Sequence, residues 1–184
     1  MNNSYVSIAY YFFVMLFMST FPNPSSANET IKRGEYLTTF GGCHDCHSPK
    51  VFTDRGPQPD PTRLLSGYPQ DSSLPPLPVE IIGPGKWGAV GSPDLTAWFG
   101  PWGVSFAINL TPDPETGMGN WTETQFIEAM RSGKHLGNGR PILPPMPWFS
   151  LAALSDSDLQ AVFAYLGSIP AIKNRVPEPI PPSN

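Results

Sequence analysis

The feature that most constrains this chain is the five-residue segment CHDCH at positions 43–47. It holds both cysteines of the sequence and two of its three histidines. A disulfide, a redox dithiol, a zinc site and a covalently attached haem all use such residues. The choice among these four uses decides what the rest of the chain must fold around.

Three of the four uses fit this segment poorly. A disulfide between Cys43 and Cys46 would close a very small loop, which removes little entropy from the unfolded chain. A thioredoxin-like dithiol needs a βαβ setting, whereas this segment follows a predicted helix and precedes a proline-rich stretch. A zinc site needs four ligands, and His135 would have to join Cys43, Cys46 and His47.

The spacing Cys-x-x-Cys-His is the pattern of c-type haem attachment. Two intervening residues let the backbone turn, so that both thiols can add to the two vinyl groups on one edge of the porphyrin. The adjacent imidazole of His47 is then carried beneath the ring, where its Nε2 can reach the iron. We therefore favour covalent haem at Cys43 and Cys46, with His47 as the proximal ligand. His44, between the cysteines, is interpreted as a spacer that faces solvent.

The second axial position of such an iron needs its own assignment. Met146 lies in ILPPMPWF, where the prolines remove backbone donors and fix φ angles. They predict a stiff, non-helical loop that holds the side chain in one direction, which makes Met146 the favoured ligand. Met118, in the glycine-flanked turn TGMGN, His135 and an open site remain alternatives. Met130 lies on the apolar face of a predicted helix and fits a role in the core.

Three segments carry the signals of amphipathic helices. Residues 29–40 end at Gly41-Gly42, a natural helix stop. Residues 122–132 open with a Thr-x-x-Gln capping box. Residues 155–168 open with a serine cap and acidic residues in the first turn, which complement the helix dipole.

The long stretch between the first two predicted helices has no strong strand pattern. Only residues 79–82 and 104–108 resemble strands. The 24 prolines and 17 glycines among 184 residues indicate much irregular backbone, although they fall just short of the proportion typical of disorder. We expect this stretch to pack through its own aromatic side chains.

The first 27 residues predict export. Residues 6–21 are almost all apolar, no charged side chain precedes Glu29, and Ser25 and Ala27 are small residues suited to a cleavage site. We favour a signal peptide cleaved after Ala27. The alternative is an uncleaved membrane anchor, but an apolar run of about 16 residues is short against the roughly 20 of a spanning helix. The net charge of −4 argues against nucleic acid as a partner.

With these residues in place, the chain resembles the class I cytochrome c family. An N-terminal helix, the haem motif, a variable middle, a methionine loop and a C-terminal helix follow one another in the family's order. The likeness is to exported bacterial monohaem cytochromes c and to cytochrome c subunits of dehydrogenases. It is carried by RGEYLTTFGGCHDCHSP, NLTPDPETGMGNWTETQFIEAMRSGKH and ILPPMPWFSLAALSDSDLQAVFAYLGSIPAIKNRVP.

The resemblance implies an all-α cytochrome c fold, with three main helices around one covalently bound haem. After a signal peptide or anchor at 1–27, residues 28–184 would form the cytochrome c domain. Within it, 48–105 would be a long irregular Pro/Gly-rich insertion and 170–184 an extended Pro-rich tail. The first and last helices should cross near Gly34.

The resemblance also implies roles for particular residues. Cys43 and Cys46 would bind the haem covalently, and His47 and Met146 would ligate its iron. The aromatic and basic residues expected near the haem pocket are Trp121, Trp148 and Arg140; the last would pair with a haem propionate or stay solvated.

A chain of this kind would be a periplasmic one-electron carrier rather than an enzyme. It would pass electrons between a dehydrogenase or another redox partner and the respiratory chain. An uncleaved N-terminal segment would tie it to the membrane. The alternative function is that of a haem c protein with an open sixth site, for ligand binding, sensing or catalysis. Exported four-helix cytochromes work in that way, but their haem motif lies near the C-terminus.

Overall fold

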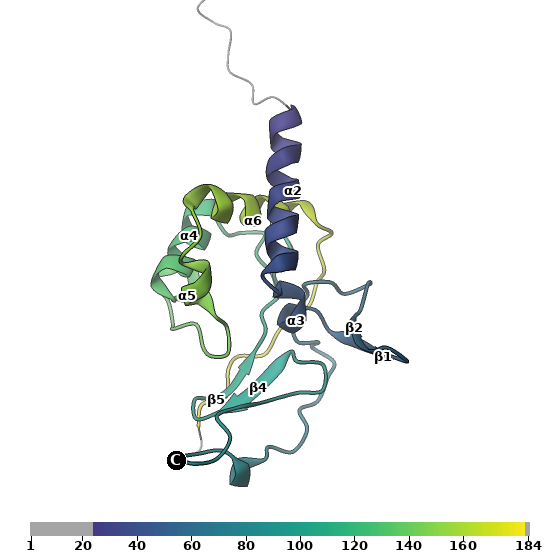
Figure 1. The fold of residues 1–184 in the computed structure, drawn as a ribbon, viewed down its shortest axis with the longest axis vertical. Coiled ribbons are helices and arrows are strands. Elements are labelled where there is room, and N and C mark those ends of the chain that lie inside the picture. Colours follow the sequence, from purple (N-terminus) through teal and green to yellow (C-terminus); the bar gives the residue numbers. More distant parts are fainter. Residues whose placement is uncertain (1–23, 183–184) are drawn as a thin grey trace, which may run out of the picture.

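The computed structural model describes residues 24–182, and Figure 1 shows how its elements are arranged. Helices α2 (Pro24–Phe40), α4 (Glu123–Ser132), α5 (Trp148–Leu151) and α6 (Asp156–Ser168) occupy the upper part of the view. The short helix α3 (Cys43–His47) lies directly below α2, and two small β-sheets flank it to the side and below.

The three helices expected from the sequence are confirmed, together with their caps. The Thr122 side chain accepts a hydrogen bond from the Gln125 backbone N–H, and the Gln125 side chain accepts one from the Thr122 N–H. This reciprocal pair is the predicted capping box, which satisfies two free donors at the start of α4. Ser155 caps α6 with a single hydrogen bond, by accepting from the Asp158 N–H at 3.1 Å.

The crossing of α2 and α6 occurs at Gly34, as predicted. A Cβ atom at Gly34 would lie 1.9 Å from the Ala161 carbonyl oxygen and 2.7 Å from the Tyr165 Cβ. Only a residue without a side chain allows the two backbones to approach so closely. An ion pair between Arg33 Nε and Asp158 Oδ1, at 2.8 Å, joins the same two helices.

The core lies where α4 and α6 meet the loops beside them. We call its buried apolar residues the hydrophobic cluster: Leu65, Met118, Phe126, Ala129, Met130, Leu159, Val162 and Leu166. The prediction that Met130 packs in the core is therefore confirmed. Burial of this apolar surface is the main force that holds the helices together.

The expectation of an all-α fold is wrong, because the stretch predicted to be irregular contains two antiparallel sheets. In the first, β1 (Lys50–Thr53) pairs with β2 (Gly56–Pro59). In the second, the strand order is β3 (Val90–Gly91), β4 (Ala97–Gly100) and β5 (Gly103–Phe106).

These strands escaped prediction because they are only two to four residues long. An alternating pattern of apolar and polar residues needs at least four to eight positions to stand out. Of the two candidates, 104–108 overlaps β5, whereas Val79–Ile81 forms a 3-10 helix, η2. A second 3-10 helix, η3, covers His135–Gly137.

The tail after α6 returns to the second sheet, as the yellow trace in Figure 1 shows. The Ile180 backbone exchanges two hydrogen bonds with Val104 of β5, at 2.8 and 3.0 Å. Halfway along, the buried Asn174 side chain donates to the carbonyl oxygens of Ser66 and Tyr68. The extended tail is thus anchored both near its middle and near its end.

The predicted signal peptide falls mainly on residues 1–23, outside the described residues. Within residues 24–182, no helix combines the length and the apolar character needed to cross a membrane.

Candidate functional site

The two cysteines lie on one short helical turn. The chain leaves α2 at Phe40 and enters α3 through Gly42, whose φ of 69° is left-handed and suits glycine. Both thiols are free and half-buried, and their i, i+3 spacing places them on the same side of the turn. Burial raises the pKa of Cys43 to about 11 and also raises that of Cys46.

The buried His47 side chain is held by a single hydrogen bond to the backbone. Its Nδ1 lies 2.8 Å from the carbonyl oxygen of Ile108. Because a carbonyl can only accept, Nδ1 must carry the proton, and Nε2 of the neutral ring is left with a free lone pair. Burial lowers the pKa of His47 and so favours the neutral ring. Within residues 24–182, Nε2 has no hydrogen-bond partner. Metal-ligating histidines are commonly held in this way.

The backbone around His47 is fixed from two directions. The His47 carbonyl accepts from the Gly67 N–H at 2.7 Å, and the Ser48 hydroxyl accepts from the Leu65 N–H at 2.9 Å. Lys50 Nζ donates to carbonyl oxygens at the end of α3, including that of His44 at 2.9 Å. Lys50 therefore acts as a cationic C-cap of α3.

His44 is not the solvent-facing spacer that the sequence suggested. It is half-buried, and its Nδ1 lies 3.0 Å from the Ser48 hydroxyl. The pKa of His44 is lowered by burial and by the Lys50 ammonium. His44 is thus partly buried against Ser48 at the end of the motif.

Met146 lies in a non-helical loop, as predicted, which spans residues 141–147 and leads directly into α5. Its side chain is partly buried and packs on the hydrophobic cluster, as Cys43 does. Met118, the alternative ligand, is buried within that cluster, and its N–H donates to the Thr111 carbonyl at 2.8 Å. Cys43, the first cysteine of the motif, and Met146, the favoured ligand, therefore contact one common core.

The other predicted pocket residues have different surroundings. Trp121 packs on the hydrophobic cluster and meets the His135 ring edge-on, with centroids 4.9 Å apart. Trp148 lies against Gly133 at the end of α4. Arg140 is exposed, and its Nε lies 4.0 Å from Glu178 of the tail. Trp121 is thus partly buried against the cluster that Cys43 and Met146 also contact, whereas Arg140 lies at the surface.

The donor set fits a covalently bound haem better than the other uses of the motif. Two free thiols share one face of a turn, and a neutral imidazole with an available Nε2 is fixed beside them. Cys43 and Cys46 are not joined by a disulfide. Within the described part of the chain, no three His, Cys, Asp or Glu side chains gather as a metal ion would require.

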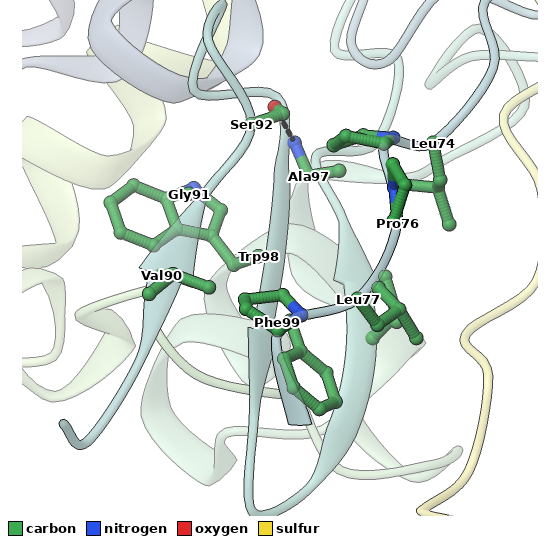
Figure 2. A pocket seen from close by; sticks show the side chains of 12 residues that line it. Leu74, Pro76, Leu77, Val90, Gly91, Ser92, Ala97, Trp98 and Phe99 are labelled. Carbon is green, nitrogen blue, oxygen red and sulfur yellow. Dashed lines mark hydrogen bonds between the residues drawn. The ribbon is translucent and has the colours of Figure 1, made fainter. Parts of the chain in front are cut away.

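A separate apolar hollow of about 170 Å³ lies between the proline-rich segment 74–78 and the second sheet. Figure 2 shows Leu77 on one side of it and Val90 and Trp98 on the other. The indole of Trp98 donates to the Leu95 carbonyl at 2.9 Å, and contact with this indole partly offsets the raised pKa of Cys46. Trp98 thus lines the hollow and is held by the turn that precedes β4.

Sequence reasoning missed the backbone groups that hold the site. The Ile108 carbonyl that orients His47 belongs to the main chain. Every residue has such a carbonyl, so the residue type at this position does not indicate its role. The same is true of the Gly67 N–H.

Comparison with known proteins gives the class of this chain. No family model matches it. It is 31% identical to the cytochrome c subunit of the quinone alcohol dehydrogenase of Gluconobacter oxydans, over 80% of this chain and 24% of the relative. It is 32% identical to the gluconate 2-dehydrogenase cytochrome c subunit of Pantoea cypripedii, over 73% of this chain and 22% of the relative. It is 29% identical to the fructose dehydrogenase cytochrome subunit of Gluconobacter japonicus, over 80% of this chain and 23% of the relative.

Together with the Cys-x-x-Cys-His turn, these similarities define the class: the chain is a c-type cytochrome. Within that class it resembles the cytochrome c subunits of dehydrogenases. It spans about a quarter of the length of these three relatives.

Proposed function

We propose that this protein is a one-electron carrier that accepts electrons from a dehydrogenase. The observation that carries the proposal is the Nδ1 hydrogen bond of His47 to Ile108, which leaves Nε2 free beside two free thiols. The names of the relatives support the kind of electron donor, because they are subunits of alcohol, gluconate and fructose dehydrogenases.

The residues on this chain would bind, orient and shield one haem c. When bound, the haem iron supplies a one-electron couple between the ferric and ferrous states. Cys43 and Cys46 would hold the group through two thioether bonds. His47 Nε2 would be the proximal ligand and the Met146 sulfur the distal one. The soft thioether of Met146 favours the ferrous state, and the hydrophobic cluster keeps water away.

The number of haems proposed is one, because the sequence holds one Cys-x-x-Cys-His segment. Two ligands from the protein would leave no open coordination site, which is why we propose a carrier and not an enzyme. Trp121 is proposed as a wall of the pocket, since it packs on the same cluster as Cys43 and Met146. Trp148 would lie nearby, two residues after Met146.

The proposed place of action is the periplasm, where the apolar segment 6–21 would direct the chain. The dehydrogenase would be the donor and a component of the respiratory chain the acceptor. Contacts with both would be small and short-lived, as in other redox encounters.

The ligand assignment is tested by replacing each candidate methionine. In haem-loaded protein, the wild type should show the weak far-red absorption band of ferric iron bound to methionine. Met146→Ala should abolish this band and allow the ferrous protein to bind carbon monoxide. Met118→Ala is the matched control and should keep the band. If Met118→Ala abolishes it instead, the assignment is wrong, and a wild type that binds carbon monoxide supports the open-site alternative.

A further inference from the structure

In the stretch 143–147 of the loop that carries Met146, one serine makes the hydrogen bond to a distant segment. Ser105, in β5, donates from its hydroxyl to the Pro144 carbonyl oxygen at 2.6 Å. Pro144 lies two residues before Met146. Pro144, Pro145 and Pro147 have no N–H to donate. Across the part of the chain that the structure describes, no other hydrogen bond joins residues 143–147 to a distant segment.

The Ser105 hydroxyl is itself oriented by its neighbours. The indole Nε1 of Trp102 donates to Ser105 Oγ at 3.2 Å. The hydroxyl has a single proton to donate, and the Pro144 oxygen at 2.6 Å is much closer than the Trp98 carbonyl at 3.5 Å. The hydrogen bonds therefore run in one direction, from the Trp102 indole to the Ser105 hydroxyl and from that hydroxyl to the Pro144 carbonyl.

The same short segment also reaches the other predicted ligand. Ile108, three residues after Ser105, provides the carbonyl that holds His47 Nδ1 at 2.8 Å. Strand β5 is in turn fixed between β4 on one edge and the Ile180 bridge on the other. Residues 105–108 thus lie next to a strand that is held on both edges. They make one hydrogen bond to the segment that carries Met146 and one to His47 itself.

We propose that Ser105 is a positioning residue for Met146, which holds the methionine loop at a fixed place relative to His47. The proposal rests on the His47 and Met146 ligation proposed above and adds how the chain enforces it. It also gives the 48–105 segment and β5 a role: they keep the distal ligand in place.

The test measures how readily imidazole displaces the distal ligand from the ferric, haem-loaded protein. A looser methionine loop should let the added ligand compete better. The loss of one hydrogen bond in Ser105→Ala should therefore raise the apparent imidazole affinity roughly fivefold. The far-red methionine band should stay in the absence of imidazole. Ser105→Thr keeps the donor and should behave like the wild type.

Ser92→Ala is the matched control. Ser92 lies in the same region, is 9% exposed where Ser105 is 7% exposed, and donates to the Asp94 carboxylate instead of the methionine loop. Its imidazole affinity should equal that of the wild type. If Ser105→Ala does not load haem, Trp102→Phe removes the upstream donor and should give a smaller increase in the same direction.

The two levels of the proposal fail in different ways. If Met146→Ala and the wild type bind imidazole equally well, the proposed ligation is wrong. If Met146→Ala binds it more tightly but Ser105→Ala matches the wild type, Ser105 does not position the loop. An equal increase in Ser105→Ala and Ser92→Ala would also overturn the positioning role, because it would reflect general loosening of the sheet.

Discussion

At the scale of single residues, main-chain atoms decide what the side chains of this site can do. The Ile108 carbonyl fixes which nitrogen of His47 carries the proton, and so which nitrogen can bind iron. The cysteines and histidine were predictable because the spacing of their side chains is specific. The carbonyl was not, since a main-chain acceptor occurs at every residue.

Asn174 is another residue whose importance depends on main-chain partners. Its amide donates to the Ser66 and Tyr68 carbonyls at 2.7 and 2.9 Å and accepts from the Gln70 N–H at 2.9 Å. The segment it holds includes Gly67, which contacts the His47 carbonyl. The tail is therefore connected to the backbone that carries His47.

Asn174→Ala should destabilise the protein by about 2–4 kcal/mol, because it leaves several buried polar groups without partners. Chemical denaturation of the haem-loaded protein, followed by tryptophan fluorescence, measures the change in the free energy of unfolding. Asn120→Ala is the control, since that amide is exposed and donates to the Pro114 carbonyl at 2.7 Å. Equal effects of the two substitutions would mean that the Asn174 network contributes little.

At the scale of elements, helices were predictable and strands were not. The caps at Thr122 and Ser155 are local signals, and they lie where the sequence placed them. The strand β5 pairs with its neighbour β4 along its length and also exchanges hydrogen bonds with Ile180, far along the chain. Strands of two to four residues are too short to show an alternating pattern, so the all-α expectation failed in this region.

Gly34→Ala should test the most important contact between elements. The new Cβ would overlap the Ala161 carbonyl at 1.9 Å, and overpacking of this kind costs roughly 1–3 kcal/mol or more. Because the two backbones would have to separate, the thermal midpoint of unfolding should fall by several degrees or more.

Gly167→Ala is the matched control in α6. A Cβ atom there would meet nothing within 4 Å, and replacing a helical glycine by alanine stabilises by roughly 0.5–1 kcal/mol. Its midpoint should stay equal or rise. A Gly34→Ala protein as stable as the wild type would contradict the close crossing of α2 and α6.

At the scale of the whole molecule, the helices, the second sheet and the tail serve one site. The helices supply the hydrophobic cluster on which Cys43 and Met146 pack. The sheet supplies Ser105 and leads into Ile108, and the tail fixes that sheet through Ile180. The predicted insertion is thus part of the frame around the site and not an appendage.

The order of the family motifs along the chain could be recognised from sequence, because each motif is local. The way in which the middle of the chain connects these motifs could not be recognised. Nothing in the sequence around Ser105 indicates that its hydroxyl donates to the Pro144 carbonyl. The same limit applies to Arg140, which the sequence left open between a haem propionate and solvent and whose guanidinium lies near Glu178 of the tail.

The most direct test of the central claim is the intact mass of the denatured protein after coexpression with haem-attachment machinery. We predict a red protein whose mass exceeds that of its polypeptide by one haem, and loss of that increment when Cys43 and Cys46 are both replaced by alanine. A colourless protein with the mass of the bare polypeptide, or a haem that an acidic organic solvent extracts, would contradict the account.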